Sequence, residues 1–127
     1  MIKVLIPTDS EFSKYADECR TLYESLQDKI CDPNPFDFII HNTFFYLFEN
    51  DGKLLGGIYY FIDDKGRLFV NAFAGRKTHL INLKCLQKTF EWFKGSIYAE
   101  AQNRASALCL LKCGFKRENG NLFVLER

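Results

Sequence analysis

The stretch that decides the fold reads Asn103-Arg104-Ala105-Ser106-Ala107-Leu108-Cys109-Leu110-Leu111-Lys112-Cys113-Gly114-Phe115. An Asn directly before a run of helix formers is a typical N-cap, so we predict a helix over 104–112 that Asn103 caps. Small residues at the start of this helix would allow close packing. Gly114 permits the left-handed conformation that commonly ends a helix, and Phe115 would then turn back into a core.

Strand patterns lie on both sides of this helix. Ser96–Ala101 is a short predicted strand, and Phe115–Arg117 with Leu122–Leu125 should form a hairpin around Asn119-Gly120, which is a strong two-residue turn signal. Runs rich in β-branched and aromatic residues predict further strands upstream. These strands cover Ile2–Ile6, Thr43–Glu49, Leu54–Ile62 and Leu68–Phe73.

Two longer helices are predicted from apolar residues that recur at steps of three and four. The first begins at Thr8, which has capping-box spacing to Glu11, and fades near Lys29. The second covers Thr78–Phe93 and would connect two parallel strands by a right-handed crossover. Phe36–Asn42 is ambiguous between helix and strand. The predicted order is β, α, an uncertain element, βββ, α, β, α, ββ. It corresponds to one α/β domain over residues 1–127, a mixed sheet with helices on both faces.

Composition narrows the classes of function. The 127 residues include 17 basic and 16 acidic side chains, so no broad basic field is expected and nucleic acid is not a favoured partner. Five cysteines without a CxxC spacing, and only two histidines, predict no metal site. We expect reduced, buried thiols in a cytoplasmic protein, with Cys109 and Cys113 packed in the core. The N-terminal apolar run is too short for a signal peptide, and no run approaches the ~20 residues of a membrane span.

The order of elements and the segment from Asn103 to Phe115 resemble the GNAT acetyltransferase superfamily over nearly the whole chain. Members of that family commonly show an Asn that opens the last helix, small residues after it, and a Gly-Phe pair at the distance of Gly114 and Phe115. The resemblance implies that acetyl-CoA binds in a gap between the fourth and fifth strands. It also implies that an acetyl group is transferred to an amine.

The resemblance further implies which residues would contact acetyl-CoA. The backbone of Phe73, Ala74 and Gly75 would hold the thioester carbonyl, and Asn103 would lie beside the cofactor. The pyrophosphate would lie at a helix start, where unpaired N–H groups and the helix dipole attract anions. That loop comprises Arg76, Lys77, Thr78, His79 and Leu80. It departs from the family pattern, because His79 and Ile81 stand where a Gly-x-Gly is expected.

The catalytic groups of the family are only partly present. Leu110 occupies the place of the Tyr that protonates the leaving thiolate, and leucine cannot donate a proton. Glu100, on the fifth strand, is the candidate general base, provided that burial raises its pKa toward the working pH. A solvated or ion-paired Glu100 is the alternative. His79 is a second candidate base by its chemistry, with an anion contact or a plain surface role also open.

Two functions therefore remain open. The first is an acetyl-CoA-dependent N-acyltransferase that acts on a small-molecule or protein amine. The second is a catalytically inactive protein that binds protein partners in an assembly. Small, aromatic-rich GNAT-like proteins without the Gly-x-Gly occur among tailed phages, including head-assembly proteins. This chain is similar to them in length, in Arg76-Lys77 without a glycine partner, and in its Phe-Glu-Trp-Phe sequence at Phe90–Phe93. A phage protein of this kind would act in the host cytoplasm.

Overall fold

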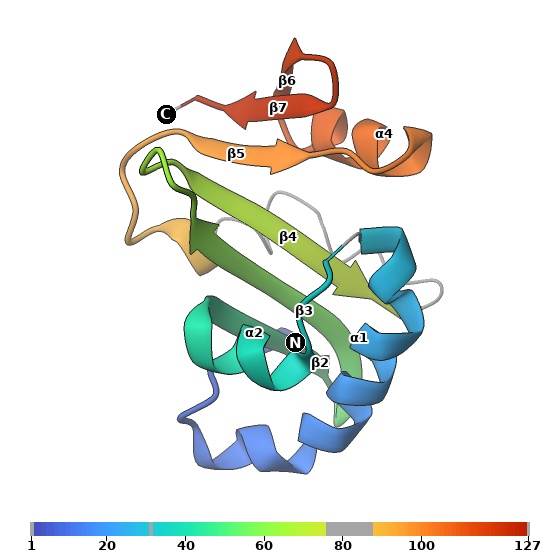
Figure 1. Ribbon diagram of the computed structural model, residues 1–127. Coiled ribbons are helices and arrows are strands. Elements are labelled where there is room, and N and C mark those ends of the chain that lie inside the picture. The colour runs from blue at the N-terminus through green and yellow to red at the C-terminus, as the bar shows by residue number, and fades with distance from the viewer. Residues whose placement is uncertain (1, 31, 76–87, 127) are drawn as a thin grey trace. The chain divides into compact units, whose positions relative to one another are not determined.

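The computed structural model describes residues 2–30, 32–75 and 88–126, and their strands form one mixed sheet (Figure 1). The strand order within these residues is β1-β2-β3-β4-β5-β7-β6. The strands are β1 (Ile2–Leu5), β2 (Phe44–Asn50), β3 (Lys53–Ile62), β4 (Leu68–Ala74), β5 (Ile97–Glu100), β6 (Lys116–Asn119) and β7 (Leu122–Leu125). The predicted mixed α/β fold is confirmed.

The chain is organised as two units, which share β3 and β4. The first unit comprises the residues up to Tyr59 and the segment that begins at Ala72. The second comprises Tyr60–Asn71 and the C-terminal part of the chain. The boundary passes through the middle of both strands. The prediction of a single domain over residues 1–127 stays a prediction.

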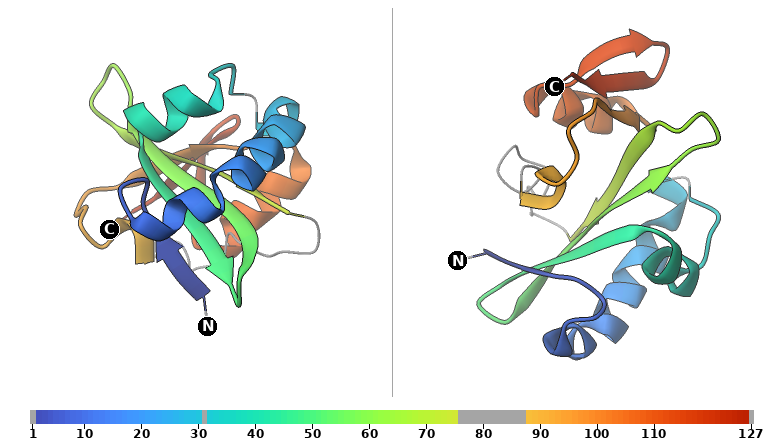
Figure 2. Two further views of the ribbon diagram at one scale, coloured as in Figure 1. Left: turned by 90° about the horizontal axis from the view of Figure 1, so that it is seen from below. Right: turned by 90° about the vertical axis from the view of Figure 1, so that its left-hand side faces the viewer.

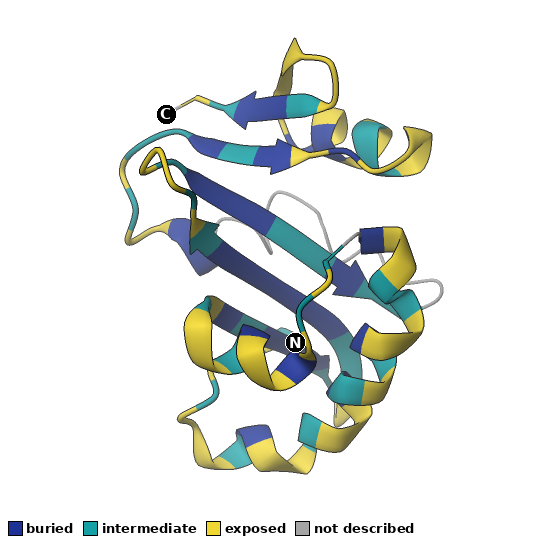
Figure 3. Cartoon of the chain, viewed as in Figure 1, coloured by how far each residue is buried: buried dark blue, intermediate teal, exposed yellow. Residues whose placement is uncertain are grey.

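An aromatic core fills the first unit. Its helices α1 (Ala16–Ile30) and α2 (Phe36–Asn42) lie on the same face of β2 and β3 (Figure 2). Side chains alternate between the faces of a strand, so Phe45 points to these helices. Its ring centroid lies 6.1 Å from that of Phe12 and 5.8 Å from that of Phe36. Tyr23 of α1 contacts Phe73 of β4 at 5.4 Å between ring centroids. Burial is concentrated on the strands, while the outward sides of the helices are exposed (Figure 3).

Gly57 on β3 makes this close aromatic packing possible. A Cβ at this position would lie 2.8 Å from ring atoms of both Phe45 and Phe73. Such a contact is too short for two carbon atoms, so the rings occupy the space that any other residue would need. Glycine is therefore required here for close approach.

Two buried hydroxyls fix the loop that joins α1 to α2. The Tyr59 hydroxyl donates to Asp32 Oδ2 at 2.7 Å, and the Tyr23 hydroxyl donates to the Asn34 carbonyl at 2.6 Å. Both rings are fully buried. Burial, followed by the charge of Asp32, raises the pKa of Tyr23 to about 12, so this hydroxyl keeps its proton.

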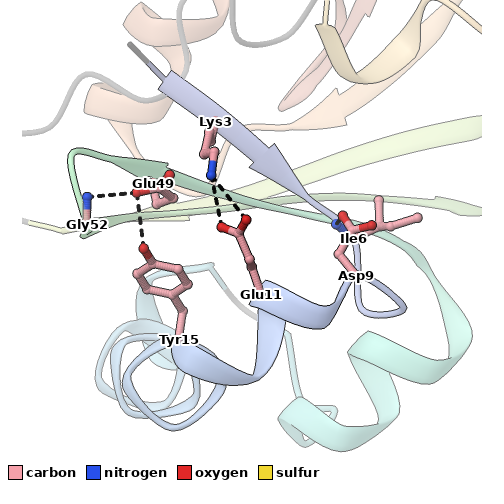
Figure 4. Close-up of polar contacts among 7 residues, drawn as sticks. All are labelled: Lys3, Ile6, Asp9, Glu11, Tyr15, Glu49 and Gly52. Atoms are coloured by element: carbon pink, nitrogen blue, oxygen red, sulfur yellow. Dashed lines mark hydrogen bonds and ion pairs between the residues drawn. The ribbon is translucent and has the colours of Figure 1, made fainter.

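Glu49 of β2 is a buried acid with two hydrogen-bond donors (Figure 4). The Tyr15 hydroxyl donates to Glu49 Oε2 at 3.1 Å, and the Gly52 N–H donates to the same oxygen at 2.9 Å. These contacts tie the start of α1 to the turn between β2 and β3. Nearby, Lys3 of β1 forms an exposed ion pair with Glu11 at 2.9 Å. The two donors to Glu49 matter because a buried carboxylate without a partner is costly in free energy.

The second unit contains the C-terminal strands and α4 (Arg104–Lys112). β5 pairs with β7 in antiparallel register from Ile97↔Leu125 to Glu100↔Leu122, and β6 pairs with β7. The predicted hairpin around Asn119-Gly120 is confirmed, with Gly120 at a φ of 56°. None of the described helices is long and apolar enough to cross a membrane.

Three of the predicted helical segments need comment. The capping box at Thr8 is wrong, because Asp9 Oδ2 accepts from the Ile6 N–H and a 3-10 helix, η1 (Ser10–Lys14), precedes α1. The ambiguous segment Phe36–Asn42 is helical. Most of the predicted helix Thr78–Phe93 lies outside the described residues. Its described end is helical only as far as Phe90, where a turn closes with the Phe93 N–H bonded to the Phe90 carbonyl.

Candidate functional site

The carboxyl end of β4 carries the residues predicted to hold a thioester carbonyl. Phe73 is buried, and its ring lies in the core beside Tyr23, so its side chain is not available to a ligand. The Gly75 N–H donates to the Leu55 carbonyl of β3 at 2.9 Å. Successive backbone groups point to opposite edges of a strand, so the N–H of Ala74 points to the edge of β4 away from β3. Any carbonyl contact here would be made by backbone.

The predicted pyrophosphate loop lies outside the described residues. This applies to Arg76, Lys77, Thr78, His79 and Leu80, and also to Ile81. Their proposed contacts with an anion stay predictions.

β5 runs parallel to β4, as predicted, and the pairing is short. The register pairs are Leu68↔Ile97 and Phe69↔Tyr98, at the first residues of β4 and of β5. β4 continues past the last of these pairs to Ala74. β5 continues to Glu100 and pairs there with Leu122 of β7.

Glu100, the candidate base, is the last residue of β5 and is exposed. The role of general base was conditional on burial, and the structure does not supply that burial. The carboxylate would therefore depend on a bound ligand for desolvation.

Asn103 caps α4 as the sequence predicts. Its Oδ1 accepts from the Ser106 N–H at 2.9 Å, and Ser106 Oγ accepts from the Asn103 N–H at 3.1 Å. Ser106 Oγ also accepts from the Gln102 N–H at 3.0 Å. The sequence analysis does not assign this reciprocal role to Ser106, although its position three after Asn103 is capping-box spacing. The cap already engages the side-chain oxygen of Asn103, which leaves the amide NH₂ as the group that a ligand would meet.

The end of α4 also matches the expectation. Gly114 has a φ of 96°, in the left-handed region, and Phe115 is buried. The Phe115 N–H donates to the Leu110 carbonyl at 3.0 Å. Leu110 itself is only 6% exposed, so it is a core residue and supplies no proton donor.

The three thiols among the described residues divide into two groups. Cys19 and Cys113 are buried, and burial raises the pKa of Cys19 to about 12, which makes that thiol unreactive. Cys109 is exposed, so the prediction that it packs in the core is wrong. Cys113 follows the last residue of α4, and its N–H donates to the Cys109 carbonyl at 3.1 Å. The described residues hold no group of three His, Cys, Asp or Glu side chains that could bind a metal.

The first unit contains an open cavity of about 480 Å³. It lies beside α1 and reaches the end of β4. Its lining residues are Asp17, Glu18, Thr21, Leu22, Ser25, Leu54 and Gly75. Sequence reasoning did not single out this surface.

Comparison with known proteins identifies the fold. No model of a protein family matches the sequence, and no curated protein matches it. Among solved structures, a GNAT-family acetyltransferase from Staphylococcus aureus Mu50 is similar at a TM-score of 0.69 and 16% identity, covering 99% of each chain. The aminoglycoside acetyltransferase AAC(6')-Ib, in complex with coenzyme A and kanamycin, has a TM-score of 0.69 and 12% identity, covering 100% of this chain and 95% of the other.

A third similar structure is the N-acetyltransferase YlbP of Bacillus subtilis in complex with coenzyme A. Its TM-score is 0.55 at 15% identity, and the match covers 100% of this chain and 97% of the other. Identities this low speak for the fold and not for the reaction. On the order of its strands, the capped helix α4 and these similarities, the chain has the GNAT fold.

Proposed function

We propose that this protein is an acyl-CoA-dependent N-acyltransferase that acts on an amine. The observation that carries the proposal is the short parallel pairing of β4 with β5, which ends at Phe69↔Tyr98 while β4 runs on to Ala74. In this fold, similar structures hold coenzyme A, and one of them also holds kanamycin, an amine.

Each predicted site residue would have a separate role in binding or catalysis. The backbone of Phe73, Ala74 and Gly75 would bind the thioester carbonyl, where charge develops during acyl transfer. The loop Arg76–Leu80 would bind the pyrophosphate, and Asn103 would contact the cofactor through its amide. Glu100 would accept the proton of the attacking amine, directly or through a water molecule.

The buried Leu110 excludes a general acid at its position in α4. No hydroxyl stands at this position of α4 to protonate the leaving thiolate. The thiolate would then leave unprotonated or take its proton from solvent. We therefore expect a low rate of acetyl transfer. Replacement of the general base Glu100 should reduce that rate more than any other single substitution.

Titration with acetyl-CoA tests the proposal. Calorimetry should show binding, and thermal denaturation should show stabilisation by about 2.7 kcal/mol at a ligand concentration of 100 Kd. Glu100→Gln should keep the affinity for acetyl-CoA and lose roughly 10²-fold or more in acetyl transfer, the usual contribution of a general base. Glu118→Gln, an exposed acid on β6, is the matched control and should behave as wild type.

Absence of binding heat and of any thermal shift at millimolar acetyl-CoA would sink the enzyme proposal. The alternative of a catalytically inactive assembly protein, including a phage head-assembly protein, would then be the hypothesis to pursue. None of the similar proteins named above is described as a phage protein. That alternative and the cytoplasmic location stay predictions.

A further inference from the structure

Arg67 lies beside the two register pairs that join β4 to β5. It directly precedes β4, whose recorded partners on β5 are Leu68↔Ile97 and Phe69↔Tyr98. The guanidinium carbon of Arg67 lies 5.2 Å from the ring centroid of Phe69 and 5.2 Å from that of Tyr98. The two ring centroids are 5.7 Å apart. One cation therefore contacts an aromatic ring from each strand, at the last register pair.

Asp63, in the turn between β3 and β4, holds this guanidinium in place. Arg67 Nε and Nη2 each lie 2.8 Å from Asp63 Oδ2. The Arg67 N–H donates to Asp63 Oδ1 at 2.8 Å, and the Asp63 N–H donates to the Arg67 carbonyl at 3.0 Å. Backbone and side chain of the two residues are thus bonded to each other. The guanidinium cannot leave the rings without breaking a contact to Asp63.

The pair is partly shielded from water. The side chains of Arg67 and Asp63 are 32% and 16% exposed. This partial burial works against ionisation of Asp63 and is the largest single effect on it. The hydrogen bonds from Arg67 and from the Lys65 N–H together outweigh it and lower the pKa of Asp63. Asp63 is therefore ionised at neutral pH and keeps its charge opposite Arg67.

The aromatic contacts around Arg67 extend to β3. The Phe61 ring stacks on the Phe69 ring, with centroids 5.7 Å apart and planes 13° from parallel. Phe61, Phe69 and Tyr98 come from three neighbouring strands of the sheet, in the order β3, β4, β5. Arg67 covers the two members that belong to β4 and β5. All of these residues belong to the second unit.

Backbone pairing alone is too weak to decide where two strands stop pairing. Two register pairs of a parallel ladder contribute little, and the interactions of side chains across neighbouring strands stabilise a sheet. A cation–π contact is stronger when it is partly shielded from water. The contacts of Arg67 with Phe69 and Tyr98 therefore add a side-chain link between β4 and β5 to the two backbone register pairs.

We propose that Arg67, held by Asp63, is a positioning residue that holds β4 to β5 at their last paired position, Phe69↔Tyr98, and through β5 sets the position of Asn103, the predicted contact of acetyl-CoA. This inference rests on the proposed function, because it assumes that the strands β4 and β5 bind acyl-CoA. Arg67 touches neither the amine nor the acyl group in this proposal. It acts through the two strands.

The test compares Arg67→Ala and Arg67→Lys with Arg117→Ala. Arg117 is a matched control, because its guanidinium carbon lies 4.9 Å from the ring centroid of Phe123 on the β6–β7 hairpin, away from β4. Calorimetry measures the Kd for acetyl-CoA at a temperature well below the Tm of each variant. Hydrogen exchange of the amides in 68–71 and 97–100 is measured on the same variants without ligand.

We expect Arg67→Ala to raise the Kd about tenfold, which corresponds to about 1.4 kcal/mol. Arg67→Lys keeps the charge but loses the planar stacking, so its Kd should lie between those of wild type and Arg67→Ala. Exchange at 68–71 and 97–100 should change in the Arg67 variants and not in Arg117→Ala. A wild-type Kd and unchanged exchange in Arg67→Ala would overturn the proposal, as would an equal loss of affinity in Arg117→Ala.

The two proposals can fail separately. If the wild-type protein does not bind acetyl-CoA, the proposed function fails, and the exchange measurement alone decides whether Arg67 fixes the pairing of β4 and β5. If Arg67→Ala is too unstable for calorimetry, Arg67→Lys supplies both measurements. If the wild type binds acetyl-CoA and the Arg67 variants bind it equally well, only the positioning role is wrong.

Discussion

Tyr23 and Tyr59 are two fully buried tyrosines whose hydroxyls hold the same loop with different partners. Tyr59 donates to the carboxylate of Asp32, while Tyr23 donates to the neutral carbonyl of Asn34. Hydrogen bonds to charged groups are worth more than those between neutral groups. Both rings are equally buried. Asp32 is the direct hydrogen-bond partner of the Tyr59 hydroxyl and acts on Tyr23 only as a nearby charge.

We expect Tyr59→Phe to lower the free energy of unfolding by about 1.5 to 3 kcal/mol, because it removes a hydrogen bond to an ionised partner. Tyr23→Phe should cost about 0.5 to 1.5 kcal/mol, the range of a neutral hydrogen bond. Urea denaturation at neutral pH measures both values. If Tyr23→Phe lowered the free energy of unfolding as much as Tyr59→Phe or more, the charge of Asp32 would not strengthen the Tyr59–Asp32 hydrogen bond.

Among the elements, α4 is held by local interactions at both ends. Asn103 and Ser106 form a reciprocal cap at its start, and Gly114 takes a left-handed conformation after its end. Both features come from residues within a few positions of each other in sequence. This explains why the helix appears with the predicted bounds, Arg104–Lys112.

Asn103→Ala should lower the free energy of unfolding by about 1 kcal/mol, because the Ser106 N–H then loses its acceptor. Asn103→Asp should retain stability, since a carboxylate oxygen accepts the same bond and carries a charge that suits a helix start. Urea denaturation checks both variants. A stable Asn103→Ala protein together with weaker acetyl-CoA binding would show that Asn103 serves the ligand rather than the helix.

At the scale of the whole molecule, the two units share β3 and β4. Each of these strands contributes residues to both units, so neither unit has a complete set of strands of its own. We therefore expect the chain to unfold in one cooperative transition, as small single domains usually do. That behaviour would also support the prediction of one domain over residues 1–127.

The single tryptophan allows this to be measured. Trp92 belongs to the second unit and contacts Tyr60, with ring centroids 6.4 Å apart. Its fluorescence reports the second unit, while far-ultraviolet circular dichroism reports the secondary structure of both. The two denaturation curves should coincide in midpoint and slope. Separate midpoints would show that the units unfold independently and would contradict the single-domain prediction.

The elements that depend on neighbours in the chain could be predicted from the amino-acid sequence. The cap of α4, its glycine exit, the hairpin around Asn119-Gly120 and the strand order along the chain were all predictable, because their signals are backbone and capping preferences within a few residues. The departure at Leu110 from a proton-donating tyrosine was also readable directly from the residue type.

Features that depend on residues far apart in the chain are set by packing in the folded protein. Phe36–Asn42 is a helix because Phe36 and Ile39 are buried there against an aromatic core, which seven residues of sequence cannot specify. Glu100 is exposed, and Arg67 lies over rings of β4 and β5, because strand pairing sets both environments. Burial and cation–π contacts are properties of the neighbours that folding brings together, so no local pattern of residues encodes them.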